Sequence, residues 1–272
     1  MKPSPFEYER PESLADALQV LATYGDRCKV LAGGQSLIPL LAMRLAQPEV
    51  IVDVARVREL SGVDRNGSRI RIGAMTTNAE MERRQDMPSP ASQALPHVGH
   101  FQIRNRGTIG GSLAHMDPAA EWPALLLAME GEVTLQSVRG RRALAAADFV
   151  QGPLMTALAD DELLVEVTLP TDGRGAGFAE VARRPGDFAL VGAACHRARS
   201  GRAGVVAFAT GTQPHRLPRL EAALEDGVPD EAELVRLAAA ELTVGGDIHA
   251  TAEYRRQVGA RMVARAVRQA WN

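Results

Sequence analysis

Residues 30–54 read VLAGGQSLIPLLAMRLAQPEVIVDV, and this stretch decides how the chain begins to fold. Residues 30–32 are typical of a short buried strand that runs into Gly33-Gly34. The leucines of residues 37–45 recur at helical spacing, with Ser36 as the expected N-cap. Residues 50–54 form a second apolar run. Strand, helix and strand in so short a space predict a parallel βαβ unit.

Outward from this unit, the pattern predicts a mixed α and β chain. A helix precedes the unit and ends at Gly25, and Asn66-Gly67 indicates a hairpin. Thr77 to Glu80 is typical of a capping box, residues 87–90 are expected to be a loop, and Asp117-Pro118 is expected to start a helix. The glycine-rich run 171–177 is the expected linker between two domains. Further strands are expected at 133–135, 163–169, 178–183, 189–197 and 205–210, and helices at 231–242 and 251–270.

Composition excludes several classes of function. The net charge is −2, so no global basic field attracts nucleic acid or an anionic membrane. No run of 18 apolar residues is present to span a bilayer, and residues 1–5 lack the apolar stretch of a signal peptide. The two cysteines, Cys28 and Cys195, form no C-x-x-C pair, so no iron–sulfur or zinc site is expected, and their isolation favours a reducing, cytoplasmic compartment.

Two glycine-rich turns carry the chemistry. Gly33-Gly34-Gln35-Ser36 joins a strand to a helix, and residues 107–112, GTIGGS, form the second turn. Glycine lets a ligand approach the backbone amides, and a helix N-terminus adds unpaired N–H groups. Both turns therefore predict anion sites suited to a diphosphate, and together they can hold one dinucleotide from both sides.

The spacing of these glycines excludes two well-known nucleotide motifs. Gly33-Gly34 lacks the later glycine of G-x-G-x-x-G, and no G-x-x-x-x-G-K-[ST] run exists. Either turn taken alone is also compatible with an ordinary tight turn.

Four ordered blocks change this balance, because they resemble the FAD-binding medium subunits of molybdenum hydroxylases. This family includes the flavoprotein subunit of carbon monoxide dehydrogenase and the flavin part of xanthine dehydrogenase. The blocks, quoted as they stand, are LAGGQSLIPL at 31–40, QIRNRGTIGGS at 102–112, RRPGDFALVG at 183–192 and HATAEYRR at 249–256. The resemblance runs from residue 6 to about residue 270.

The resemblance implies an α+β fold with two domains. Residues 1–172 are expected to form an FAD-binding domain of the vanillyl-alcohol-oxidase type. Its small parallel α/β lobe covers about 1–56 and its mixed β lobe 57–172. Residues 176–272 are expected to form a C-terminal domain with a small antiparallel sheet and helices.

The resemblance also implies which residues contact a noncovalent FAD. Residues of both turns are expected around the diphosphate, Glu121 at the adenosine half, and Leu164 and Phe188 near the flavin ring. The full expected set is Ala32, Gly33, Gly34, Gln35, Ser36, Leu37, Thr108, Ile109, Gly110, Gly111, Ser112, Glu121, Leu164 and Phe188. Arg104 and Arg106 flank the second turn and can meet phosphate or a partner subunit, but the preferred interpretation is ordinary surface or salt-bridge residues.

The resemblance finally implies an electron-transfer subunit. A large subunit is expected to oxidise the substrate at a molybdenum cofactor, and a small subunit to pass electrons through two [2Fe-2S] clusters to FAD. The FAD then reduces an external acceptor, so no catalytic side chain and no metal ligand is expected in this chain. The expected assembly is a dimer of heterotrimers. Two alternatives stay open: a stand-alone FAD oxidoreductase of the same fold, and a cofactor-free binding module.

Overall fold

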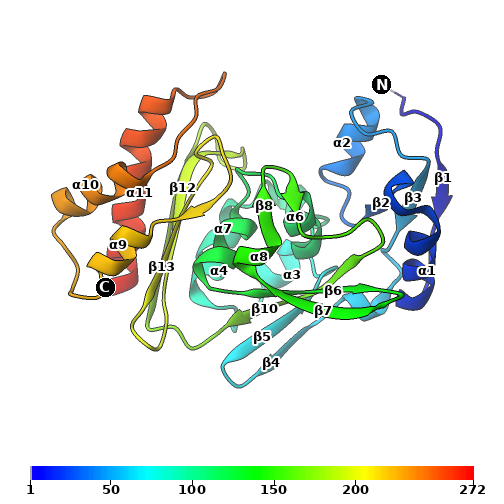
Figure 1. Ribbon diagram of the computed structural model, residues 1–272, viewed down its shortest axis with the longest axis horizontal. Helices are drawn as coiled ribbons and strands as arrows, with labels where there is room; N and C mark the ends of the chain where they lie inside the picture. Colours follow the sequence, from blue (N-terminus) through cyan, green and yellow to red (C-terminus); the bar gives the residue numbers. More distant parts are fainter. Residues whose placement is uncertain (1) are drawn as a thin grey trace.

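The computed structural model describes residues 2–272 and shows three larger sheets arranged along the long axis of the molecule (Figure 1). A fourth sheet in this part of the chain has only two short strands. A small sheet near the N-terminus lies at the right of Figure 1, a five-stranded sheet with its helices lies in the middle, and a four-stranded sheet backed by the last helices lies at the left. The mixture of helices and sheets, with an antiparallel sheet in the C-terminal part, agrees with the predicted α+β fold.

The first sheet contains the predicted βαβ unit. Strands β2 (Cys28–Leu31) and β3 (Val50–Asp53) pair in parallel and are joined through α2 (Leu37–Ala42). Strand β1 (Glu7–Glu9), which the sequence pattern missed, adds in parallel to the other edge of β3. Helix α1 (Leu14–Tyr24) and the single turn η1 (Gly25–Arg27) connect β1 to β2.

One detail of this unit differs from the prediction. Ser36 occupies the N-cap position of α2, but its hydroxyl makes no capping hydrogen bond. The first turn therefore keeps its hydroxyl and its amides available for other partners.

The second sheet is antiparallel with strand order β4-β5-β10-β6-β7. The predicted Asn66-Gly67 hairpin joins its first two strands, with Gly67 at φ 59°. Its strands are β4 (Val63–Asn66), β5 (Arg69–Gly73), β6 (Glu132–Ser137), β7 (Gly140–Ala145) and β10 (Leu163–Pro170), and the turn η2 (Arg58–Leu60) leads into it.

Short helices cover this sheet, and two of them correct the sequence prediction. Residues 87–90 are not only a loop, because α4 begins at Ser89 with Pro90 in its first turn, where proline loses no hydrogen bond. Asp117 caps a preceding turn by accepting from the Ala119 amide, so α7 begins later than predicted, at Glu121. The elements are α3 (Asn78–Glu82), α4 (Ser89–Ala94), η3 (Leu95–His97), α5 (Phe101–Arg104), α6 (Ile109–His115), α7 (Glu121–Ala128), α8 (Ala146–Phe149), β8 (Val150–Gly152) and β9 (Met155–Thr156).

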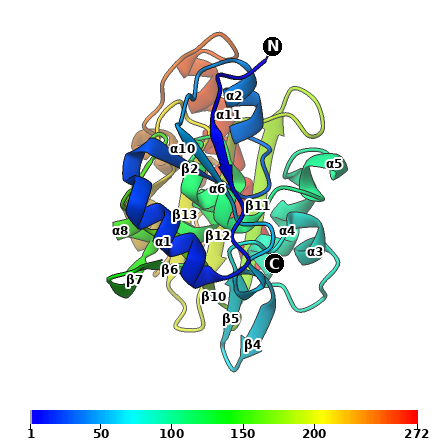
Figure 2. The ribbon, with the colours of Figure 1, turned by 90° about the vertical axis from the view of Figure 1, so that its right-hand side faces the viewer.

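The third sheet is antiparallel with order β11-β12-β13-β14. The final helix α11 lies along one face, and α4 and α7 approach the other (Figures 1 and 2). The elements are β11 (Gly175–Ala182), β12 (Ala189–Arg197), β13 (Ala203–Phe208), β14 (His215–Arg216), α9 (Pro218–Ala223), α10 (Glu231–Glu241) and α11 (Ala252–Trp271).

The glycine run before this sheet is only partly a linker. Gly175 and Gly177 lie inside β11, and a Cβ at either position would lie 1.9 Å from a carbonyl oxygen of α11. These glycines therefore allow strand and helix to pack backbone to backbone, and the linker shortens to the residues before 175.

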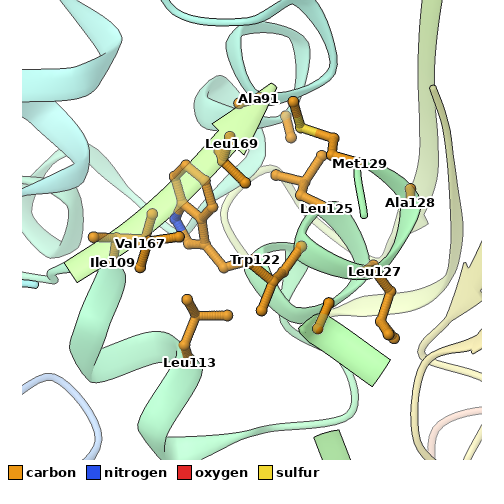
Figure 3. Packing of buried hydrophobic residues seen from close by; sticks show 14 of the residues in the cluster. Ala91, Ile109, Leu113, Trp122, Leu125, Leu127, Ala128, Met129, Val167 and Leu169 are labelled. Carbon is orange, nitrogen blue, oxygen red and sulfur yellow. The ribbon is translucent and has the colours of Figure 1, made fainter. Parts of the chain in front are cut away.

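The largest apolar core spans the second sheet, its helices and the inner face of the third sheet. Trp122 of α7 lies near its centre, surrounded by Ile109, Val167 and Leu169 (Figure 3). A second core fills the space between the outer face of the third sheet and α9 to α11. Within residues 2–272, every helix is too short or too polar to cross a bilayer.

Candidate FAD site

The two glycine turns lie directly against each other. The contact joins Gly33 to Arg106, which are 73 positions apart in the sequence. A Cβ on Gly33 would lie 2.1 Å from the carbonyl oxygen of Arg106 and 2.9 Å from the Cα of Gly107. Gly34 has φ 75°, a left-handed conformation that favours glycine. The first glycine thus provides the close approach between turns, and the second provides the bend.

The backbone of the first turn leaves four donors unengaged. Within residues 2–272, the N–H groups of Gly33, Gly34, Gln35 and Ser36 donate to no backbone or side-chain acceptor. Gly33, Gly34 and Gln35 line a cavity of about 360 Å³, within the range of about 300–1,000 Å³ typical of small-molecule sites, and Ser36 follows them directly in the chain. Its lining is Leu31, Ala32, Gly33, Gly34, Gln35, Ile38, Pro39, Asp53 and Arg106. Neighbouring N–H groups of this kind form an anion-binding concavity.

The second turn uses its amides differently from the prediction. Ile109 and Gly110 donate to the carbonyls of Thr76 and Ala74, at 3.2 and 2.9 Å. Gly111 donates to Oγ1 of Thr108, and Ser112 to its carbonyl. The expectation that both turns offer amides is therefore wrong for these four groups. The N–H and hydroxyl of Thr108 and the hydroxyl of Ser112 are the donors that remain there.

Asn78 holds the second turn in place, a role that the sequence pattern did not reveal. Its Nδ2 donates to the Gly107 carbonyl at 3.1 Å, and its Oδ1 accepts from Nε1 of Trp122 at 2.7 Å. The Asn78 amide also donates to the Gly107 carbonyl, at 2.9 Å. Because Asn78 is 2% exposed, these hydrogen bonds form in a dry interior and fix the turn relative to α3 and α7.

Glu121 lies at the start of α7 and is 5% exposed. Burial, followed by the nearby Glu180 carboxylate, raises the pKa of Glu121 to about 8. At neutral pH the folded chain therefore holds a neutral carboxyl at this position, which can donate a hydrogen bond. Neither this side chain nor Leu164 or Phe188 lines the cavity at the first turn.

The other two expected contacts lie in different surroundings. Leu164 is 3% exposed and belongs to the main core, at a register shift where β10 pairs with β6. Phe188 is 62% exposed, in the connection between β11 and β12. Gly186 in this connection packs against the ring of His100, so the loop is anchored beside the residues that precede the second turn.

The two arginines that flank the second turn have different roles. Arg104 is held by Glu82 at 2.8 Å and by the carbonyl of Gly99 at 2.7 Å. Arg106 lines the cavity, and its guanidinium has no hydrogen bond or ion pair within the described chain. The interpretation as a surface or salt-bridge residue therefore fits Arg104 through its ion pair, whereas Arg106 makes no ion pair within residues 2–272 and lines the cavity. Across residues 2–272, no group of three His, Cys, Asp or Glu side chains is placed to hold a metal ion.

Comparisons with known proteins agree with this arrangement. Residues 4–172 match the family model described as the FAD binding domain in molybdopterin dehydrogenase, and residues 176–270 match that of the CO dehydrogenase flavoprotein C-terminal domain. The chain is 41% identical to the nicotine 6-hydroxylase medium subunit of Paenarthrobacter nicotinovorans, over 99% of both chains. It is 35% identical to the carbon monoxide dehydrogenase medium chain of Hydrogenophaga pseudoflava, over 100% of this chain and 99% of that one.

Solved structures give the same result. A carbon monoxide dehydrogenase structure from Hydrogenophaga pseudoflava matches with a TM-score of 0.94 and 34% identity, covering 100% of this chain and 99% of the other. Quinoline 2-oxidoreductase from Pseudomonas putida 86 matches with a TM-score of 0.92 and 34% identity, covering 99% and 98%.

The fold and the site define a flavoprotein, that is, an oxidoreductase component with an FAD-binding domain. The chain belongs to the family of flavoprotein medium subunits of molybdenum-dependent dehydrogenases and hydroxylases. The predicted family and the predicted cofactor, FAD, are thereby confirmed.

Proposed function

We propose that this chain holds one noncovalent FAD against its two glycine turns and relays electrons within a three-subunit molybdenum hydroxylase. The observation that carries the proposal is the run of four unengaged amides from Gly33 to Ser36, the first three of which belong to residues that line the cavity. FAD has a diphosphate, and clustered N–H donors are suited to phosphate oxygens.

The contacts proposed for FAD are those expected from the sequence, with roles refined by the hydrogen bonds. The first turn supplies amides, while Thr108 and Ser112 supply hydroxyls. Gly110 shapes the second turn, because a Cβ there would lie 2.5 Å from that of Ala74. The proposed set is Ala32, Gly33, Gly34, Gln35, Ser36, Leu37, Thr108, Ile109, Gly110, Gly111, Ser112, Glu121, Leu164 and Phe188.

The proposed domains are an FAD-binding domain at 1–172, with lobes of about 1–56 and 57–172, and a C-terminal flavoprotein domain at 176–272. FAD supplies the two-electron chemistry when bound, and the chain's residues bind it, orient it and exclude water from it. No side chain of this chain is proposed as catalytic.

The proposed complex contains a large subunit with a molybdenum cofactor and a small subunit with two [2Fe-2S] clusters, arranged as a dimer of heterotrimers. The words medium subunit and medium chain in the names of the relatives support additional subunits. The two free, buried thiols support a reducing compartment, and we propose the cytoplasm.

The test begins with the chain purified alone and with its two proposed partners. We expect a yellow protein with one FAD per chain, whose flavin is reduced by substrate only when both partners are present. A purified chain that lacks flavin and takes up none would contradict FAD binding. Substrate turnover by the chain alone, with full flavin, would instead favour the stand-alone oxidoreductase.

A variant sharpens this test. Changing Gly33 or Gly110 to a larger residue disturbs the packing of the turns, so loss of flavin would be ambiguous. Ser112→Ala removes one half-buried hydroxyl and leaves the backbone unchanged. Loss of a single neutral hydrogen bond is expected to raise the Kd for FAD about fivefold, measured by quenching of flavin fluorescence.

A further inference from the structure

The charge balance of the cavity is unexplained by the residues assigned so far. A diphosphate carries negative charge, and the first turn offers it only neutral amide donors. The one acidic residue that lines the cavity, Asp53, adds negative charge and is 7% exposed. A cation at the cavity would therefore offset the negative charge of the diphosphate, which neutral amides cannot do.

Asp53 is already engaged by other groups. Its Oδ1 accepts from the Ala55 amide at 2.9 Å, its Oδ2 accepts from the Tyr8 hydroxyl, and Nε of Arg10 lies 3.4 Å from that oxygen. The negative charge of this carboxylate is therefore offset by Arg10, which does not line the cavity. In the described part of the chain, Asp53 makes no ion pair with Arg106.

Arg106 is the cationic residue of that lining. Its backbone packs against the first turn, because a Cβ on Gly33 would lie only 2.1 Å from the Arg106 carbonyl oxygen. Its guanidinium has no acidic partner within residues 2–272, unlike that of Arg104 two positions earlier, which pairs with Glu82. Arg106 lines the same cavity as three of the free amides, and an unpaired guanidinium has the donors and the charge for bidentate contact with a phosphate.

We propose that Arg106 binds the diphosphate of FAD, opposite the amides of Gly33 to Ser36. This inference rests on the proposed function and adds to it a charged ligand from the second turn. It also gives the close packing of the turns a purpose: Gly33 brings the Arg106 backbone near enough for one phosphate group to be contacted from both turns.

The test compares Arg106→Gln with Arg106→Lys and with a control, Arg69→Gln, in chains freed of flavin. Arg69 is exposed on β5, a strand of the middle sheet that lies away from α2 in Figure 1, and it has no ion-pair partner within the described residues. Kd values are measured for FAD, ADP and adenosine. ADP carries the diphosphate, and adenosine has the same base and sugar without phosphate.

For Arg106→Gln we expect the Kd of FAD and of ADP to rise about tenfold to hundredfold, as for loss of a charge-assisted hydrogen bond. The Kd of adenosine stays unchanged, Arg106→Lys loses less, and Arg69→Gln matches the unmodified chain. Equal weakening of adenosine and ADP would overturn the phosphate contact and place Arg106 at the nucleoside. Unchanged FAD affinity in Arg106→Gln would overturn the inference and leave FAD binding intact. An unmodified chain that binds neither FAD nor ADP would instead overturn the proposed function.

Discussion

Nδ1 of His97 lies 3.2 Å from Oε1 of Glu180, and this contact connects the turn η3 to strand β11 of the third sheet. The Glu180 side chain is 4% exposed, and within residues 2–272 its Oε2 has no hydrogen-bond partner. Its charge contributes to the raised pKa of Glu121, and its hydrogen bond raises the pKa of His97. Two buried acids and a half-exposed histidine therefore meet where the second and third sheets face each other.

This arrangement predicts that the chain loses stability as pH rises toward 8. The folded pKa of Glu121, about 8, exceeds its value in an unfolded chain, about 4.3, so the folded state binds the extra proton between them. Stability from this group is complete below the unfolded pKa and is lost as pH rises through the folded one. Glu121→Gln should remove this slope and stabilise the flavin-free chain at pH 8 on the order of a few kcal/mol, measured by urea unfolding across pH.

His97 adds a smaller loss of stability with rising pH, in the same direction as that of Glu121. Its folded pKa is raised, so its stabilising contribution is complete below the unfolded value and is lost as pH rises through the folded value. His97→Gln should flatten the curve slightly near neutrality and leave the Glu121 slope in place. A pH profile of unfolding that is the same in Glu121→Gln and in the unmodified chain would contradict the assignment.

Asn78 predicts a coupled loss of stability and flavin. Asn78→Ala leaves Nε1 of Trp122 and one bond to the Gly107 carbonyl unmet in a dry interior, which costs about 2–3 kcal/mol. Thermal unfolding and flavin content should both fall. Asn105→Ala is the matched control, because that side chain is exposed and makes no hydrogen bond in the described structure, and it should retain both properties.

Gly177 predicts the cost of separating β11 from α11. A Cβ there would lie 1.9 Å from the Ala266 carbonyl, so Gly177→Ala should destabilise the chain by about 3 kcal/mol, the upper end for overpacking. Gly152→Ala, where the nearest atom to a Cβ is 3.7 Å away, should change stability by less than about 0.5 kcal/mol. Equal unfolding midpoints in urea for the two variants would show that the strand and helix separate at little cost.

The thiols are predicted to be unreactive in the folded chain. Burial raises the pKa of Cys195 to about 12 and also raises that of Cys28. Because the thiolate is the reactive species, a chromogenic disulfide reagent should label neither cysteine until urea unfolds the chain. Rapid labelling under native conditions would mean that the strand of Cys195 opens.

The sequence predicted those elements whose signals are local. The βαβ unit, the Asn66-Gly67 hairpin and the Thr77 cap are each set by residues within a few positions, and each is present. Strand β1 escaped prediction because its three exposed residues carry no apolar alternation and pair only through the backbone of β3. The start of α7 was misplaced because Asp117 caps a separate turn.

The site was predictable in its residue types and less so in its donors. Glycines at 33–34 and 107–111 indicated close backbone approach, but their partners lie far along the chain. Only the fold shows that Gly110 donates to Ala74, which removes its amide from the site. For the same reason Arg104 and Arg106 look alike in sequence, while Glu82 holds one of them and the cavity borders the other.

The contact of Gly175 and Gly177 with α11 has a consequence for biosynthesis. Strand β11 and its covering helix α11 are at opposite ends of the C-terminal part of the sequence, so β11 is synthesised long before residues 252–271. The outer face of β11 therefore stays exposed until α11 has been made and packs on it. The nascent chain can complete its flavin-binding domain early in translation, but the C-terminal domain closes only once residues 252–271 have been made.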